Sequence, residues 1–262
     1  MKNSKIDNGN TFDWGKTSQD YAKYRDIYPE VFYQKILKRN IGTAGQKILD
    51  LGTGTGVLPR NLYQYGAEWT GIDVSENQIA QAKRLAGQQN MKINFQAVPA
   101  EKAGFPENTF DAVTACQCFW YFNPEVLMPV LQKIMKPDSR LLLLQMMWLP
   151  FEDALAQASE NLVLKYNPQW TGAGEKRHPV YVDEKVLKYA ELVFHEECAV
   201  QVPFTREAWH GRMKACRGVG ASLSGTALAD WEQEHLAMLK QNAPEHFEIL
   251  HYIAMAELKI KK

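Results

Sequence analysis

The sequence predicts an α/β fold with a doubly wound sheet that is mostly parallel and carries an antiparallel strand at its C-terminal end. Between residues 44 and 148, apolar strand-like runs alternate with segments of helical periodicity, a pattern typical of parallel sheets with helices on both faces. A glycine-rich turn directly follows the first of these strands, at a position where such folds bind ligands. Beyond Pro150 the pattern changes to helical segments separated by loops, which predicts a helical cap inserted into this fold.

The expected elements follow one another in a regular order along the chain. Residues 17–40 have helical periodicity with a break at Tyr28-Pro29, because the residue before a proline disfavours the helical conformation. The expected strands are 47–51, 68–72, 93–98, 110–116, 140–147, 194–204 and 247–260. The other expected helices are 57–65, 76–88, 124–135, 151–166, 183–192, 205–217 and 228–242. Four segments result: an N-terminal helical segment (1–43), a ligand-binding core (44–150), a cap with the sixth strand (151–245) and a closing strand (246–262).

The composition limits the partners and the location that we expect. Lys and Arg total 30 and Asp and Glu total 30 among 262 residues, so no net charge attracts nucleic acid or an anionic membrane. The most apolar run, 141–151, is shorter than the roughly 20 residues that span a bilayer as a helix. The polar first residues lack a signal-peptide core, and four cysteines in a chain of this length do not indicate a disulfide framework. We therefore expect a cytoplasmic protein without nucleic-acid or membrane partners.

The glycine-rich turn has the sequence Asp50-Leu-Gly52-Thr53-Gly54-Thr-Gly56 and separates a buried strand from a helix. Glycines allow a left-handed backbone and the close approach of a ligand, and the helix behind them offers unpaired N–H groups. Dinucleotide folds use G-x-G-x-x-G to bind a pyrophosphate, whereas the spacing here is G-x-G-x-G. A carboxylate at Asp50 would repel a pyrophosphate and attract an ammonium group, which favours S-adenosylmethionine over NAD. A tight turn without a ligand is the alternative.

A second acidic residue, Asp73, ends the second expected strand within Gly71-Ile-Asp73-Val74-Ser75. Ligands of open α/β sheets bind beyond the carboxyl ends of the strands, and a carboxylate there can accept both hydroxyls of a ribose. This feature would serve NAD equally well. Asp73 could instead cap the helix that begins near Ser75, and Ser75 could take the capping role while Asp73 binds a ribose.

Residues 45–148 resemble the class I S-adenosylmethionine-dependent methyltransferase domain, in particular its broad group of small-molecule enzymes. The turn Asp50–Gly56 resembles the first family motif, Gly71–Ser75 the second, and Val98–Asp111 the segment usually written G-D-A-E-x-L-P-F-x-D-x-S-F-D. The resemblance implies a Rossmann-like fold, S-adenosylmethionine as cofactor and methyl transfer to a small organic acceptor.

The resemblance also implies a role for each matching residue. The methionine part of the cofactor would lie against the turn and the end of the fourth strand, and its ribose would bind Asp73. Its adenine would lie beside Val74, Ala100 and Glu101. The implied cofactor residues are Asp50, Gly52, Thr53, Gly54, Gly56, Asp73, Val74, Gln78, Ala100, Glu101, Cys116 and Gln117. Two positions depart from the family pattern. Pro99 replaces the usual acidic partner of the adenine amino group, and Gln78 stands where a methionine often packs on the adenine.

An N-terminal stretch, Tyr21-Ala-Lys-Tyr-Arg25-Asp-Ile-Tyr28-Pro29, resembles a Y-x-x-Y/F-R-x-x-Y-P segment that folds over the cofactor in many of these enzymes. Tyr21 and Arg25 are four residues apart, so they share one helix face. The resemblance implies that Tyr21 and Arg25 contact the cofactor and that Arg25 pairs with its carboxylate. An ordinary amphipathic helix with a surface arginine is the alternative.

The substrate pocket is expected beside four successive aromatic residues, Phe119 to Phe122, at the end of the fourth strand. Aromatic faces stabilise a sulfonium cation and exclude water, and we expect Trp120 and Tyr121, together with Tyr28, to line the pocket. The alternative is core packing at the sheet edge, because alternation along a strand would bury at least half of the run.

No histidine falls in a recognisable base motif, so His178 and His210 are only weak candidates for an acid–base role. Cys116 and Cys118 lack further metal ligands, so no metal is expected. The alternative functions are an NAD-dependent oxidoreductase and a non-catalytic S-adenosylmethionine-binding regulatory protein.

Overall fold

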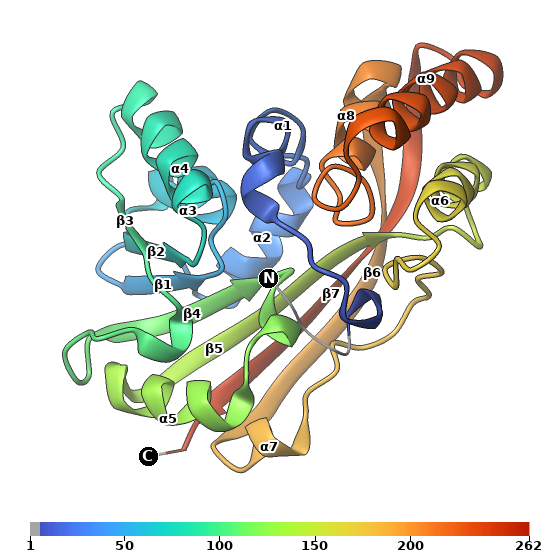
Figure 1. Cartoon of the computed structure of the whole chain (residues 1–262). Coiled ribbons are helices and arrows are strands. Elements are labelled where there is room, and N and C mark those ends of the chain that lie inside the picture. Colours follow the sequence, from blue (N-terminus) through green and yellow to red (C-terminus); the bar gives the residue numbers. More distant parts are fainter. Residues whose placement is uncertain (1–5, 262) are drawn as a thin grey trace. The chain divides into compact units, whose positions relative to one another are not determined.

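A computed structural model describes residues 6–261 and contains a seven-stranded sheet with the order β3-β2-β1-β4-β5-β7-β6 (Figure 1). The strands are β1 (Lys47–Leu51), β2 (Glu68–Asp73), β3 (Asn94–Ala97), β4 (Phe110–Cys116), β5 (Met135–Trp148), β6 (Ala190–Thr205) and β7 (His246–Ile260). The pairs β1–β2, β2–β3, β1–β4 and β4–β5 are parallel, and the C-terminal strands are antiparallel. The predicted fold class is confirmed.

The chain divides into two compact units. The first, which we call the helical unit, comprises the described residues up to 27 together with 147–177 and 199–252. The second, the core unit, comprises 28–146, 178–198 and 253–261. The boundaries cut the long strands β5, β6 and β7, so each of these strands contributes residues to both units.

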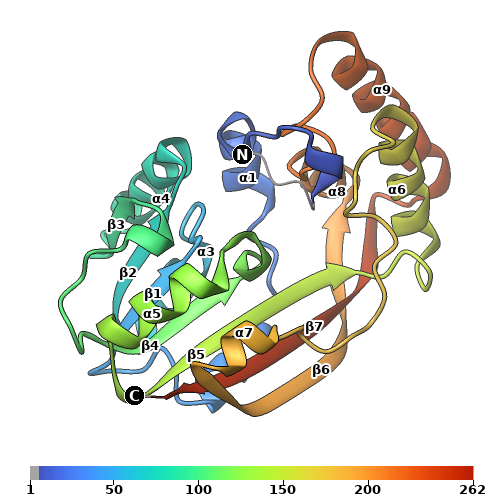
Figure 2. The same ribbon diagram turned by 60° about the horizontal axis from the view of Figure 1, so that its bottom comes forward.

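The core unit has helices on both faces of its parallel strands (Figures 1 and 2). Its helices are α2 (Glu30–Lys38), α3 (Val57–Leu62), α4 (Glu76–Gln88), α5 (Pro124–Ile134) and α7 (Glu184–Leu187). Ile48, Leu49 and Leu51 of β1 are all fully buried, because a central parallel strand is covered on both sides. This coverage explains why the strand has a continuous apolar sequence instead of an alternating one.

One expected element of the core unit is wrong. The helix expected over 183–192 ends at Leu187, and β6 already begins at Ala190. Residues 190–192 have side chains that suit a helix, but pairing with the neighbouring strand overrides this local preference. The expected break at Tyr28-Pro29 is confirmed, since α1 ends at Tyr24 and α2 begins at Glu30.

A buried ion-pair network in the core unit joins the end of α2 to β5 and β7. Glu257 of β7 is 1% exposed and accepts hydrogen bonds from Arg39 Nε at 2.5 Å and from Arg140 Nη1 at 3.1 Å. Arg140 also donates to the backbone carbonyls of Arg39 and Asn40. A buried carboxylate is tolerated because two guanidinium groups and their hydrogen bonds compensate for its lost hydration.

The helical unit contains α1 (Ser18–Tyr24), α6 (Ala154–Tyr166), α8 (Arg206–Lys214) and α9 (Gly225–Asn242). The helices α1 and α8 are in close contact, because a Cβ at Gly211 would lie 2.2 Å from the Tyr24 ring. The Tyr24 hydroxyl donates to Glu207 at 2.9 Å, and Lys23 pairs with the same carboxylate. Within the described residues, no helix is long and apolar enough to cross a membrane.

A chain of buried hydrogen bonds ties α6, α8 and α9 together. Ser159 Oγ donates to the carbonyl of Leu155 and accepts from Trp209 Nε1 at 2.9 Å. His235 Nε2 lies 3.1 Å from the same hydroxyl and must therefore donate its proton. The His235 Nδ1 lone pair then accepts from His210 Nδ1 at 2.9 Å. The proton positions follow from the single hydroxyl proton of Ser159, and they fix one tautomer for each histidine.

His251 of β7 is a further fully buried histidine of the helical unit. Its Nδ1 donates to the carbonyl of Ile249 at 2.9 Å, because a carbonyl can only accept. Burial is the main reason why the pKa of this imidazole falls to about 3, with smaller contributions from the charges of Arg212 and Arg25. His251 is therefore neutral at pH 7.

We predict that His251 makes the protein less stable as the pH falls below 6.5. Above pH 6.5 the imidazole is neutral in both states, whereas between pH 6.5 and about 3 only the unfolded chain takes up the proton. The free energy of unfolding should fall by about 1.4 kcal/mol per pH unit from this residue. Urea unfolding from about pH 7.5 to about pH 5.5 should show a shallower decline for His251→Phe than for the wild type. An equal decline of the free energy of unfolding in both proteins would contradict a neutral, buried His251 in the folded state.

Candidate cofactor site

The glycine turn between β1 and α3 has a left-handed backbone at all three glycines. The φ angles are +57° at Gly52, +56° at Gly54 and +74° at Gly56, values that residues with a Cβ adopt at a cost of about 1–2 kcal/mol. The amide of Thr53 donates to the carbonyl of Ile72 at 2.9 Å, which fixes the turn against β2. The predicted strand, turn and helix are all present.

Two of these glycines also make room for neighbouring side chains. A Cβ at Gly52 would lie 2.8 Å from both Cβ and Sγ of Cys118, and one at Gly56 would lie 2.6 Å from the ring of Phe95. Cys118 is held in place by a hydrogen bond from its Sγ to the carbonyl of Leu51 at 3.1 Å. The glycine spacing indicates backbone freedom and ligand approach, but it carries no signal for this packing requirement.

Asp50 lies beneath the turn and is 2% exposed. Its two carboxylate oxygens accept from the hydroxyls of Thr53 and Thr114, each at 2.6 Å. Burial raises the pKa of Asp50 to about 7, the charge of Asp73 adds to this effect, and the two hydroxyl bonds oppose it. Because Asp50 is buried and both of its oxygens already accept from protein hydroxyls, it would act on a ligand through its charge and through the shape of the turn.

Asp73 connects the same turn to the second strand and to α4. Its Oδ2 accepts from the amide of Gly54 at 3.0 Å, and its Oδ1 accepts from the amide of Ser75 at 2.9 Å. Burial raises the pKa of Asp73, and the backbone hydrogen bonds oppose this shift. The Ser75 hydroxyl is the cap of α4, accepting from the amide of Gln78. Next to Asp73, the side chain of Val74 is 52% exposed and offers an apolar surface.

The end of β4 places Cys116, Gln117 and Tyr28 close together. Gln117 has a φ of +62°, which is strained for a residue with a side chain. Its amide donates to the carbonyl of Leu144 at 2.9 Å and its side chain to that of Met146, so the strained backbone is held by β5. The Cys116 thiol donates to the Tyr28 hydroxyl at 3.3 Å. Such backbone strain occurs often at functional sites.

The aromatic run after β4 forms a 3-10 turn over Phe119–Tyr121 instead of continuing the strand. Phe119, Tyr121 and Phe122 nevertheless pack against the hydrophobic core, so at least half of the run is core packing, as the alternative held. Because a 3-10 turn rotates each residue by about 120°, Phe119 and Phe122 lie close together, with centroids 6.1 Å apart. Trp120 is 42% exposed, whereas Tyr121 is partly buried against the hydrophobic core of the core unit. Trp120 is therefore more accessible to a substrate than Tyr121.

Three other candidate residues of the core unit have protein partners or are buried. Ala100 is buried and begins a short 3-10 turn after Pro99. Glu101 accepts from the amide of Asn123 at 3.2 Å, and Asn123 caps α5. Gln78 is buried within α4. Their proposed contacts with an adenine stay predictions.

The N-terminal candidates belong to the helical unit. Tyr21 lies in α1, but its side chain lies outside the described part of the structure. Arg25 follows α1, is half-buried, and contributes to the low pKa of His251. Of the two weak base candidates, His178 is exposed, and His210 bonds to His235. The roles of Tyr21 and Arg25 toward a cofactor stay predictions.

Comparison with known proteins identifies the central part of the chain. Residues 48–137 match the family model for a methyltransferase domain. A ubiquinone biosynthesis O-methyltransferase of Coxiella burnetii is 32% identical over 108 residues, which are 41% of this chain and 46% of the relative. Another from Azoarcus sp. is 34% identical over 126 residues, 47% of this chain and 53% of the relative. The chain thus spans about half the length of the curated relatives it matches.

Solved structures give the same fold. The YcgJ protein of Bacillus subtilis has a TM-score of 0.55 and 17% identity, covering 89% of this chain and all of that one. A type II methyltransferase candidate from Anaeromyxobacter dehalogenans has a TM-score of 0.58 and 16% identity, covering 88% and 96%. Residues 48–137 therefore match a methyltransferase domain, as their motifs indicated.

We predict that Gly52→Ala destabilises the protein more than Gly45→Ala. Both glycines have a left-handed backbone, so each substitution costs about 1–2 kcal/mol of strain. A Cβ at Gly45 meets no atom within 4 Å, whereas one at Gly52 collides with Cys118 and adds about 1–3 kcal/mol. Urea unfolding measures both free energies, and equal losses would show that Cys118 moves aside freely.

Proposed function

We propose that this protein transfers a methyl group from S-adenosylmethionine to a small organic acceptor. The observation that carries the proposal is the glycine turn held between two carboxylates, with Asp50 beneath it and Asp73 bonded to Gly54. The turn lies within the methyltransferase domain segment. A pyrophosphate would meet two carboxylates here, so the arrangement favours a cationic ligand over NAD.

The residues at the carboxyl ends of β1, β2 and β4 fit this cofactor. Glycines at 52 and 54 would allow its methionine part to approach the backbone, with Cys116 and Gln117 on the β4 side. Asp73 would accept from the ribose hydroxyls, and the exposed side chain of Val74 would contact the adenine. Bound S-adenosylmethionine supplies an electrophilic methyl group, and the protein's part is to align the acceptor with it and exclude water.

An oxygen atom is the acceptor that we propose. Relatives from several organisms are ubiquinone biosynthesis O-methyltransferases. Trp120 is exposed at the end of β4 and would shield the sulfonium from water, with Tyr28 as a further lining residue. A cytoplasmic location, expected from the sequence, stays a prediction.

We predict that the full chain binds S-adenosylmethionine and S-adenosylhomocysteine and binds NAD weakly or not at all. Isothermal calorimetry with the three ligands measures this directly. A screen for methyl transfer to hydroxylated small molecules then separates an enzyme from a non-catalytic binding protein. Tight binding of NAD without binding of S-adenosylmethionine would contradict the proposal.

The same calorimetry isolates the role of Asp73. Asp73→Ala removes a charge-assisted hydrogen bond worth about 1.5–3 kcal/mol, so the dissociation constant should rise roughly ten- to a hundredfold. Ser75→Ala is the matched control, because it removes only the cap of α4. If both variants fold and both raise the dissociation constant equally little, Asp73 bonds only the backbone amides and does not bind the ribose.

A further inference from the structure

The strand β6 is the last strand of the sheet, so one of its two edges is open. Within residues 6–261, β6 has β7 as its one neighbouring strand (Figure 2). Its outer edge therefore presents backbone N–H and C=O groups that no other strand of the described sheet pairs. The first half of β6, residues 190–196, belongs entirely to the core unit.

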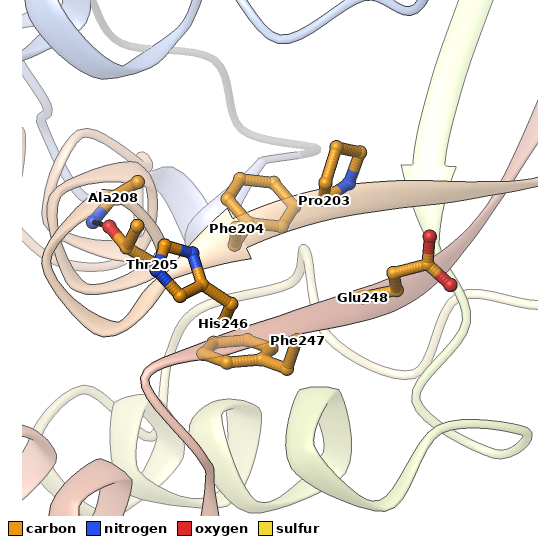
Figure 3. A pocket seen from close by; sticks show the side chains of 7 residues that line it. All are labelled: Pro203, Phe204, Thr205, Ala208, His246, Phe247 and Glu248. Carbon is orange, nitrogen blue, oxygen red and sulfur yellow. Dashed lines mark hydrogen bonds between the residues drawn. The ribbon is translucent and has the colours of Figure 1, made fainter.

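The two halves of β6 differ in how well their edge is protected from pairing with another chain. Proteins protect long edge strands with proline or lysine. Pro203 interrupts the far end of β6, where it lines an open pocket with Phe204 (Figure 3). Residues 190–196 contain no proline, glycine or lysine. In this half Leu192 is 41% exposed and Val193 is 47% exposed, so an unprotected edge carries apolar surface.

Contacts with α2 show which side chains of this half share a face. The guanidinium of Arg39 lies 4.0 Å from the ring centroid of Phe194, and Glu196 pairs with Lys35. Both partners belong to α2. Because side chains alternate along a strand, Leu192 is on the same side of the strand as Phe194, and the odd-numbered residues of 190–196 point to the opposite side. The charge of Glu196 is already compensated by Lys35.

A second copy of this edge is its own complement in one antiparallel register. In a two-fold symmetric pair of identical antiparallel strands, one residue faces itself across the axis. With Val193 at the axis, Glu191 faces His195 of the second copy and Leu192 faces Phe194, and each of these pairs occurs twice. The imidazole can donate to the carboxylate, and the apolar pairs cover both exposed side chains. Such cross-strand pairs contribute roughly 0.2–1 kcal/mol each.

The adjacent registers lack this complementarity. An axis at Phe194 would place Glu191 opposite Glu197, and like charges directly opposite each other destabilise a strand pair. An axis at Leu192 would place Glu191 opposite Val193 and leave the carboxylate without a polar partner. The order of side chains along residues 190–196 therefore favours the register centred on Val193.

We infer that two copies of this chain associate through residues 190–196 of β6, whose antiparallel pairing extends the sheet across a two-fold axis. Main-chain hydrogen bonds would hold the strands together, as in other cases of strand addition to a sheet edge. A ladder of seven residues is short compared with stable interfaces, so we expect a weak dimer with a dissociation constant of about 10–100 µM. No residue of the candidate cofactor site takes part, so this inference does not rest on the proposed function.

Sedimentation velocity of the full chain from about 5 to about 500 µM should show a change from monomer to dimer. Val193→Lys places two like charges on either side of the axis and should raise the dissociation constant at least about tenfold. Val126→Lys is the matched control, because Val126 of α5 has a similar exposed fraction of 46% and lies outside β6. This control should leave the dimer unchanged.

An exchange of charges tests the register itself. His195→Glu places two carboxylates opposite each other in each of the two outer pairs and should weaken the dimer. Glu191→His combined with His195→Glu exchanges the two side chains and should restore the affinity to within about threefold of the wild type. Two independent structural defects would instead add, so restoration identifies a direct pair across the axis.

Hydrogen exchange of the wild type locates the interface without relying on a variant that folds. The amides of residues 190–196 should exchange more slowly at about 500 µM than at about 5 µM, whereas those of β3 at the other edge of the sheet should not change. A monomer at about 500 µM, a dimer unaffected by Val193→Lys, a double variant as weak as His195→Glu, or equal exchange of 190–196 at both concentrations would overturn the inference.

Discussion

The buried carboxylate of Asp50 joins the glycine turn to the neighbouring strand, and the geometry of the candidate site depends on this contact. Thr53 belongs to the turn and Thr114 to β4, and each donates its hydroxyl to one oxygen of Asp50. Removing the Asp50 carboxylate would leave the buried hydroxyls of Thr53 and Thr114 without this acceptor, at a cost of about 1–3 kcal/mol each. The turn is thereby fixed relative to both adjacent strands before any ligand binds, which is the preorganisation that methyl transfer needs.

The other contacts of the site extend this arrangement. Asp73 links the amide of Gly54 to the first turn of α4, so the glycine turn is held from the β1 side and from the β2 side. Cys118 fills the space that the absent side chain of Gly52 leaves. Gln117 holds its strained backbone through two bonds to β5. Each contact joins elements that are distant in sequence, so the site depends on the assembled sheet.

The parts of the fold that the sequence predicted depend on local signals. The strand, glycine turn and helix around Asp50–Gly56 follow from an apolar run, glycine spacing and helical periodicity within a short window. The same holds for the break at Tyr28-Pro29. The cap of the following helix was open between Asp73 and Ser75, and the structure has Ser75 in this role. These features need no knowledge of tertiary contacts, and the structure has them where the sequence predicts them.

The features that the sequence did not predict depend on contacts between distant residues. The partner of Asp50 on β4 lies 64 positions further along the chain, and no local pattern marks Thr114 as that partner. The start of β6 at Ala190 follows from strand pairing that overrides helix preference. Trp148, Phe204 and His251 meet only because three separate strands are adjacent. No local pattern therefore marks His251 as a member of this cluster.

In the function that we propose, the charge of Asp50 beneath the glycine turn favours the cationic methionine end of S-adenosylmethionine. With a pKa of about 7, Asp50 loses its charge as the pH falls from about 7.5 to about 6, whereas an α-amino group with a pKa of about 7.7–8.0 only becomes more fully protonated. Calorimetry over this range should show that the affinity of Asp50→Asn does not fall with pH and that the affinity of the wild type falls relative to it, since any titration of Asp73 or of the ligand is common to both proteins. If the affinities of the two proteins for S-adenosylmethionine change with pH in parallel, the charge of Asp50 does not contribute to binding.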